Sequence, residues 1–254
     1  MTGEIDWRIQ AADRNFAASY EKLVGTRPGS ELRRYGATVA FDSRIPIRIF
    51  NGVAVLEPTT TRDVRTALAW IRDRDIPFSV WVREDLVTSV GKTLLEAGVA
   101  PIEDGGEPVM GMRPPAEVPD PPAGVSILEV VDEGTLEDHI RSTVGSGFPE
   151  EATRQLYGQR FLDDPDIRMF TAYVDGRPAG NSVAIRSGPV SGVYSVGVPE
   201  ELRRRGIGAA ITWAAVRAGL EWGCEFVVLQ SSPMGFGVYR QMGFEVLTHY
   251  AIFR

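Results

Sequence analysis

The sequence has little of several residues on which common functions depend. Among its 254 residues there is one cysteine, Cys224, and there are two histidines, His139 and His249. A single cysteine excludes an internal disulfide, which fits a reducing compartment. So few thiols and imidazoles argue against a zinc site, which usually takes four such ligands. We therefore expect no metal cofactor.

Long apolar runs and an excess of basic charge are also missing. No stretch reaches the roughly 18 apolar residues of a transmembrane helix, and the opening MTGEIDWRIQ lacks the apolar core of a secretory signal. The formal net charge is −7, so no general basic field attracts nucleic acid or an anionic membrane. We expect a cytoplasmic protein that binds neither, and the sequence leaves a homodimer open.

A proline-rich segment divides the chain. Residues 113–124 read RPPAEVPDPPAG, with five prolines in twelve residues. Because proline continues neither a helix nor a central strand, we interpret this segment as a semi-rigid linker. It separates a domain at residues 1–112 from a domain at residues 125–254.

The pattern of the C-terminal part predicts an α/β domain with a mixed, partly antiparallel sheet. Its expected order is a strand, two helices, three strands, a helix, a strand, a short helix and a strand. The expected strands are residues 125–131, 169–174, 180–186, 193–198, 226–230 and 246–253. The expected helices are residues 133–162, broken near 145–149, and residues 206–222 and 237–242.

The segment 193–210, VYSVGVPEELRRRGIGAA, carries the strongest chemical signal. It predicts a strand, a turn with three arginines, Gly206 and Gly208, and then a long helix. Glycines at a helix N-terminus let backbone N–H groups approach an anion, and the helix dipole and the arginines add positive charge. A solvated basic helix start is the alternative. The loop has neither the Lys-Ser/Thr pair of a Walker A loop nor the GxGxxG spacing of a dinucleotide fold.

These residues, R-x-x-G-x-G between a strand and a long helix, resemble motif A of the GNAT acyltransferases. The resemblance implies that the loop holds the pyrophosphate of acetyl-CoA, as a cosubstrate. Gly197 suggests a bulge in the preceding strand, which in the family admits the pantetheine arm. The implied cofactor-binding residues are Val196, Val198, Arg203, Arg204, Arg205, Gly206, Ile207, Gly208 and Ala209.

A second motif of the family follows at the expected place, since Tyr239-Arg-Gln-Met-Gly243-Phe244 is similar to its Y-x-x-x-G-F. The resemblance implies that Tyr239 is catalytic and protonates the departing thiolate; a core tyrosine capped by a Gly-Phe turn is the alternative. Ser232 stands where many relatives carry an asparagine that bonds CoA, and its hydroxyl can make one such bond. Glu150 and Glu151 are weak candidates for the base that deprotonates the amine.

The N-terminal part repeats the layout of the motif region. Expected strands at 53–56 and 78–82 alternate with expected helices at 61–74 and 88–97. We interpret this as a smaller, degenerate GNAT-like unit that serves as a scaffold or as a wall of the acceptor site. Where the loop has glycines, this unit has Pro58 to Asp63 and no glycine, so we expect no acetyl-CoA there.

The sequence therefore predicts an N-acetyltransferase that moves an acetyl group from acetyl-CoA to a primary amine by direct attack on the thioester. The acceptor is a small molecule, a peptide or a protein. The alternative is a non-catalytic acyl-CoA-binding regulatory module. The acceptor itself cannot be read from these motifs, because loops determine it.

Overall fold

The structure is a computed structural model that describes residues 6–102 and 106–254. The first five residues of the opening segment, in which we expect no signal, lie outside the described residues. The chain forms two compact units. The C-terminal unit combines the described residues of Met1–Asn15 with Met110–Glu245, and the N-terminal unit combines Phe16–Val109 with Val246–Arg254. The predicted division at 113–124 assigns each end of the chain to its own domain. In the structure the described residues up to Asn15 belong to the C-terminal unit, and residues 246–254 belong to the N-terminal unit.

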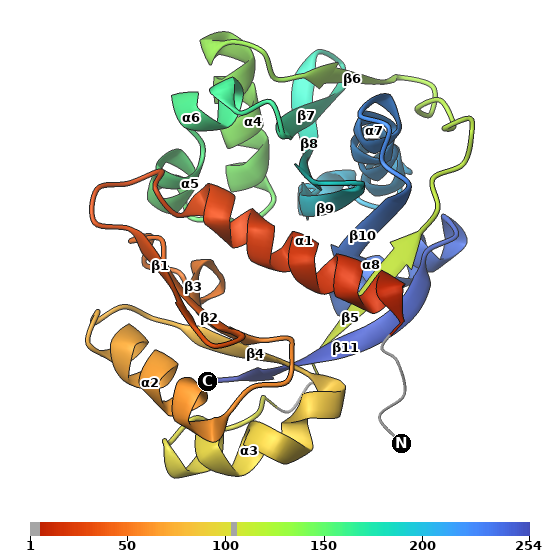
Figure 1. Cartoon of the computed structure of the whole chain (residues 1–254). Coiled ribbons are helices and arrows are strands. Elements are labelled where there is room, and N and C mark those ends of the chain that lie inside the picture. Colours follow the sequence, from red (N-terminus) through yellow and green to blue (C-terminus); the bar gives the residue numbers. More distant parts are fainter. Residues whose placement is uncertain (1–5, 103–105) are drawn as a thin grey trace. The chain divides into compact units, whose positions relative to one another are not determined.

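The C-terminal unit follows the predicted order of elements up to its last helix (Figure 1). It differs in having three helices instead of two after its first strand, and the predicted last strand belongs to the N-terminal unit. Its strands are β6 (Val125–Glu129), β7 (Ile167–Val174), β8 (Arg177–Ser187), β9 (Val190–Gly197) and β10 (Phe226–Gln230). Its helices are α4 (Glu133–Gly145), α5 (Glu150–Leu156), α6 (Gln159–Asp163), α7 (Ile207–Glu221) and α8 (Pro233–Gln241), and η3 (Glu200–Leu202) is a short 3-10 turn. Strands β6 to β9 are antiparallel neighbours, and β10 is parallel to β9. The predicted mixed α/β sheet is thus confirmed.

Helices α4 and α7 cover opposite faces of this sheet. On β8, the Asn181 side chain meets Ser142 of α4, whereas the hydroxyl of the next residue, Ser182, donates to the Ile211 carbonyl of α7 at 2.8 Å. Successive side chains of a strand point to opposite faces, so the two helices lie on different sides. Helix α4 begins at a capping box between Asp132 and Thr135.

The N-terminal unit has its own sheet and core. Strands β1 (Glu31–Tyr35), β2 (Thr38–Asp42) and β3 (Asn51–Val55) are antiparallel, β4 (Ser79–Arg83) is parallel to β3, and β11 (Glu245–Phe253) is antiparallel to β4. Helices α2 (Thr61–Arg72) and α3 (Val87–Glu96) lie side by side (Figure 1). The short 3-10 turns η1 (Arg48–Phe50) and η2 (Glu84–Leu86) complete the order. Helix α1 (Trp7–Leu23) and strand β5 (Glu107–Met112) each run across the unit boundary.

The predicted repeat of a strand–helix–strand arrangement is confirmed. In the N-terminal unit β3, α2 and the parallel β4 correspond to β9, α7 and the parallel β10 of the C-terminal unit. The two copies differ in how far their parallel strands pair. Strands β3 and β4 pair from Gly52↔Ser79 to Val55↔Val82, up to the end of β3.

Candidate active site

The parallel strands β9 and β10 separate partway along their length. Their pairing runs from Phe226↔Val190 to Val228↔Gly192, although β9 continues to Gly197 and β10 to Gln230. Strand-to-strand hydrogen bonding therefore ends where β9 enters the segment before the arginine loop. Such a parting exposes backbone edges to which an extended ligand with amide groups can bond.

A bulge in β9 lies at this point, but not at Gly197 as the sequence suggests. Asn181 pairs with Gly197 and Val183 with Tyr194, so Ser195 and Val196 together oppose a single residue of β8. Ser195 has φ +51°, a left-handed conformation that costs a non-glycine residue about 1–2 kcal/mol. Packing explains why residue 197 is a glycine, because a Cβ there would lie 2.5 Å from Ser146 Oγ and 2.7 Å from Asn181 Oδ1.

The arginine loop ends in a helix start that has no side-chain cap. Gly206 is the N-cap of α7 with φ +78°, and no side chain bonds the first turn. The first intrahelical bond is donated by Ala210 to the Gly206 carbonyl at 3.0 Å. The N–H groups of Ile207, Gly208 and Ala209 therefore have no partner within the helix. They are available to an anion, as the motif predicts.

The three arginines of the loop differ in their surroundings. Arg203 Nε donates to the Val198 carbonyl at 3.1 Å, which closes the turn between β9 and α7. Val198 is one of the implied acetyl-CoA contacts, and its carbonyl already accepts this hydrogen bond within the turn. Arg204 has φ +64°, and both Arg204 and Arg205 are exposed. The exposed pair supplies positive charge at the positive end of the α7 dipole.

Tyr239 lies on α8 and is connected to the loop through α7. Its side chain is 8% exposed and interacts with the hydroxyl of Thr212, which donates to the Gly208 carbonyl at 2.8 Å. Burial raises the pKa of Tyr239 to about 12, and the Thr212 contact partly opposes that rise. The phenol therefore stays protonated at neutral pH. Gly235 lacks a side chain where a Cβ would lie 2.7 Å from the Tyr239 ring.

Ser232 is placed at the start of α8, next to the end of β10. Its side-chain oxygen accepts a hydrogen bond from the Gly235 N–H at 3.2 Å and so caps the helix. The hydroxyl proton stays available as a donor. The role of Ser232 toward a ligand stays a prediction.

The two candidate bases, Glu150 and Glu151, already accept hydrogen bonds from other side chains at the surface. Glu150 accepts a hydrogen bond from Arg154 Nε at 3.0 Å, and Glu151 accepts one from Gln155. Both glutamates are exposed in the first turn of α5. This arrangement does not favour either of them as a base. Within residues 6–102 and 106–254, no group of three or more His, Cys, Asp or Glu side chains is arranged to hold a metal ion.

A buried polar cluster under the bulge has no sequence motif. Asn181 donates to the Ser195 carbonyl at 2.5 Å and accepts from Ser142 Oγ at 3.3 Å. Tyr157 is buried nearby, and its ring packs edge-on against the ring of His139. Burial lowers the pKa of His139 to about 4. The only signal in the sequence is a polar residue inside an expected strand, which is too common to identify a site.

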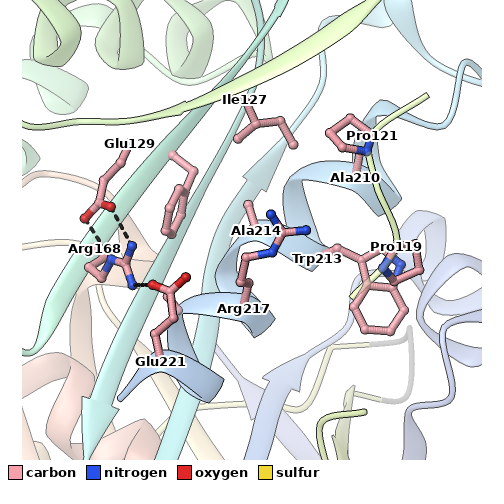
Figure 2. A pocket seen from close by; sticks show the side chains of 12 residues that line it. Pro119, Pro121, Ile127, Glu129, Arg168, Ala210, Trp213, Ala214, Arg217 and Glu221 are labelled. Atoms are coloured by element: carbon pink, nitrogen blue, oxygen red, sulfur yellow. Dashed lines mark hydrogen bonds and ion pairs between the residues drawn. The ribbon is translucent and has the colours of Figure 1, made fainter. Parts of the chain in front are cut away.

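A separate groove lies between α7, the strands β6 and β7 and the linker (Figure 2). It has a volume of about 230 Å³ and is lined by α7, β6, β7 and two prolines of the linker. Arg168 bonds Glu129 and Glu221 along one wall, and Arg217 lies in the middle. None of the predicted site residues lines this groove. The linker itself follows α7, because Arg217 donates to the Val118 carbonyl at 3.5 Å and Pro122 lies against Gly206.

Comparison with known proteins identifies the C-terminal domain. Residues 126–231 match the family model described as the acetyltransferase (GNAT) domain. No curated protein sequence matches the chain. No described helix has the length and apolarity needed to cross a membrane.

Solved structures match over nearly the whole chain. A GCN5-related N-acetyltransferase from Kribbella flavida superposes with a TM-score of 0.71 at 22% identity, covering 95% of this chain and 94% of that one. One from Sphaerobacter thermophilus gives 0.63 at 19% identity, over 85% and 76%. A tandem GNAT protein from the clavulanic acid biosynthesis pathway gives 0.61 at 15% identity, over 98% and 94%.

Residues 126–231 are therefore a GNAT acetyltransferase domain, and an N-terminal unit precedes it in the manner of the tandem GNAT fold. At these identities the solved structures establish the fold alone.

Proposed function

We propose that the protein transfers an acetyl group from acetyl-CoA to a primary amine of a small molecule, peptide or protein. The observation that carries this proposal is the glycine-capped start of α7 beside the parted strands β9 and β10. A phosphate-bearing ligand with an extended amide arm matches both features. The family domain supplies the reaction class.

The residues present fit acetyl-CoA. A Cβ at Gly208 would meet only Val198 at 3.8 Å, so the first turn of α7 is open. The N–H groups of Ile207, Gly208 and Ala209 would hold the pyrophosphate, and Arg204 and Arg205 would add charge. The backbone at Val196 and the hydroxyl of Ser232 would contact the rest of the molecule. When bound, acetyl-CoA supplies a thioester whose carbonyl carbon accepts a nucleophile.

The chain's own groups then manage protons and charge. The overall reaction joins the amine nitrogen to the acetyl carbon, breaks the carbon–sulfur bond and leaves a thiol. Tyr239 donates its phenolic proton to the sulfur as that bond breaks. The amine must be neutral to attack, and an ordinary lysine-like amine has a pKa of about 10.4. Since Glu150 and Glu151 are paired at the surface, we propose that solvent takes up the proton that the ammonium loses before attack. The second proton, which the nitrogen loses after attack, passes through solvent to the Tyr239 oxygen and restores the phenol.

A non-catalytic acyl-CoA-binding module is the second candidate. It is favoured by one observation, the pairing of both candidate base carboxylates with Arg154 and Gln155. Tyr239 favours the enzyme, because a module that only binds has no use for a proton donor beside the ligand loop.

An amine panel separates the two candidates. Thiol release from acetyl-CoA by the intact chain should be measured with aminoglycosides, polyamines, amino acids and peptides. An enzyme releases thiol faster with at least one amine than without it. Saturable acetyl-CoA binding with no amine-dependent release by any panel member identifies the binding module.

A further inference from the structure

The bulge of β9 is held from below by one buried amide. Asn181 of β8 is 1% exposed. Its Nδ2 donates to the Ser195 carbonyl at 2.5 Å, and its Oδ1 accepts from Ser142 Oγ of α4 at 3.3 Å. Both hydrogen-bonding functions of the amide are thus used, one toward the bulge and one toward the helix.

This contact fixes the direction of the next backbone donor. The peptide bond between Ser195 and Val196 is planar and trans, so its C=O and N–H point in opposite directions. Asn181 draws the Ser195 carbonyl toward β8. The Val196 N–H therefore points away from β8, and β10 is the strand on the other side of β9. It points there in the stretch where β10 no longer pairs with β9.

The conformation needs such support. Ser195 has φ +51° and is not glycine, so its left-handed conformation persists only when the surroundings determine it. Gly197 leaves the room that the amide requires, because a Cβ there would lie 2.7 Å from Asn181 Oδ1. The bulge, the amide and the missing side chain form one consistent arrangement.

We propose that Asn181 is a positioning residue for acetyl transfer, which aims the Val196 N–H at the carbonyl oxygen of the thioester. This inference rests on the proposed function. Negative charge grows on that oxygen as the amine attacks, and a fixed backbone donor stabilises it. Asn181 itself stays buried under the strand and acts only through Ser195.

Two variants test this in the intact protein. Asn181→Ala removes the donor, and kcat for thiol release should fall at least about tenfold, because losing one oxyanion donor typically costs about 100–1000-fold. The Kd for CoA without its acetyl group should stay within about twofold, since the α7 loop binds the phosphates. Ser182→Ala is the matched control, because it removes a buried hydrogen bond one residue away on the opposite face and should leave kcat unchanged.

Asn181→Asp supplies a signature that a purely structural role would not produce. A buried aspartate has a raised pKa, and only its protonated form can donate to the Ser195 carbonyl. The ratio of variant to wild-type kcat should therefore rise as pH falls. A crystal structure of Asn181→Ala should show that Ser195 leaves its left-handed conformation.

The outcomes separate this inference from the proposed function. If the wild type neither binds acetyl-CoA nor releases thiol, the proposed function fails, and the variant's crystal structure still decides whether Asn181 holds the bulge. If the wild type is active and Asn181→Ala keeps its kcat, or the bulge of the variant is unchanged, the inference is overturned. A fall in CoA affinity equal to the fall in kcat also overturns it.

Discussion

Asn181 and Ser195 lie 14 residues apart on neighbouring strands and are joined by a hydrogen bond of 2.5 Å from the buried amide to the backbone carbonyl. On the other side of the sheet, Thr212 connects the Gly208 carbonyl to Tyr239. One contact holds the bulge of β9, and the other connects the start of α7 to the expected proton donor.

Gly206→Glu should weaken acetyl-CoA binding at least about tenfold. The substitution places a carboxylate where phosphate is expected and forces a side chain into a left-handed position beside Pro122. Charge-assisted hydrogen bonds that are lost contribute about 1.5–3 kcal/mol each. Calorimetry measures the affinity. Gly223→Glu is the matched control, because Gly223 has φ +74° at the other end of α7 with open space around it. If both variants bound acetyl-CoA with the same affinity, the loop before α7 would not be the phosphate site.

Tyr239→Phe should keep acetyl-CoA affinity and lower kcat by about 100–10,000-fold, the usual contribution of a general acid. Only the hydroxyl is removed, so the ring still packs against Gly235. Tyr173→Phe is the control, since the Tyr173 hydroxyl bonds Asp138 at 2.9 Å instead. Steady-state kinetics with an accepted amine give the answer. A Tyr239→Phe kcat within about twofold of wild type would exclude the role.

The pH dependence of kcat/KM should have a rising limb and no falling limb below about pH 10. The rise comes from deprotonation of the amine, whose pKa is about 10.4 for a lysine-like group. The required proton on Tyr239 is retained, because burial raises the pKa of that phenol to about 12. A profile from pH 6 to 10 measures this. A decline centred near pH 8 would mean that a different group donates the proton.

His139 should make the fold less stable in weak acid. Burial lowers the pKa of His139 from 6.5 to about 4, so between these values the unfolded chain binds more protons than the folded chain. The unfolding free energy should then fall as pH drops from about 6.5 to 4, by on the order of 3 kcal/mol. Urea unfolding measures it. His139→Phe should flatten this dependence, whereas Thr171→Val, which removes only the partner of Nδ1, should retain it.

The intact chain should bind one acetyl-CoA. In the N-terminal unit, Thr60 Oγ1 accepts from the Asp63 N–H at 3.1 Å, so the start of α2 is already capped and carries a carboxylate. Strands β3 and β4 also stay paired to the end of β3. Calorimetry gives the stoichiometry. A second site, especially one that survives Gly206→Glu, would contradict this view. The intact chain is used for this measurement, because a fragment ending at Met112 lacks β11, which pairs with β4 in this unit.

Local signals in the sequence predict most of the fold. The glycine-capped helix, the strand FVVLQ and the apolar pattern of α2 are each determined within one segment, and all three appear in the structure. The pair β1 and β2 has no such signal, because Glu31–Tyr35 is largely charged and only partly buried. The sequence also does not predict that β11 belongs to the N-terminal unit. Its pattern predicts a strand but does not indicate that the strand pairs with β4.

The candidate site is predictable only where it depends on motifs. Gly206, Gly208 and Tyr239 have a fixed spacing, so the sequence identifies them. The bulge does not lie at Gly197, because its position depends on Asn181 and Ser142 from other elements, and their contacts are made only on folding. The sequence does not identify Thr212 either, because it is a single polar residue on a largely apolar helix.

Acetyl transfer is measured most directly by following the acetyl group itself. Acetyl-CoA labelled in its acetyl carbons should be mixed with the intact protein and the amine panel, and the products analysed by mass spectrometry. The label should appear as an amide on the nitrogen of at least one primary amine, at a rate that Gly206→Glu and Tyr239→Phe both reduce. Saturable binding of acetyl-CoA with no label transferred to any amine would contradict this expectation.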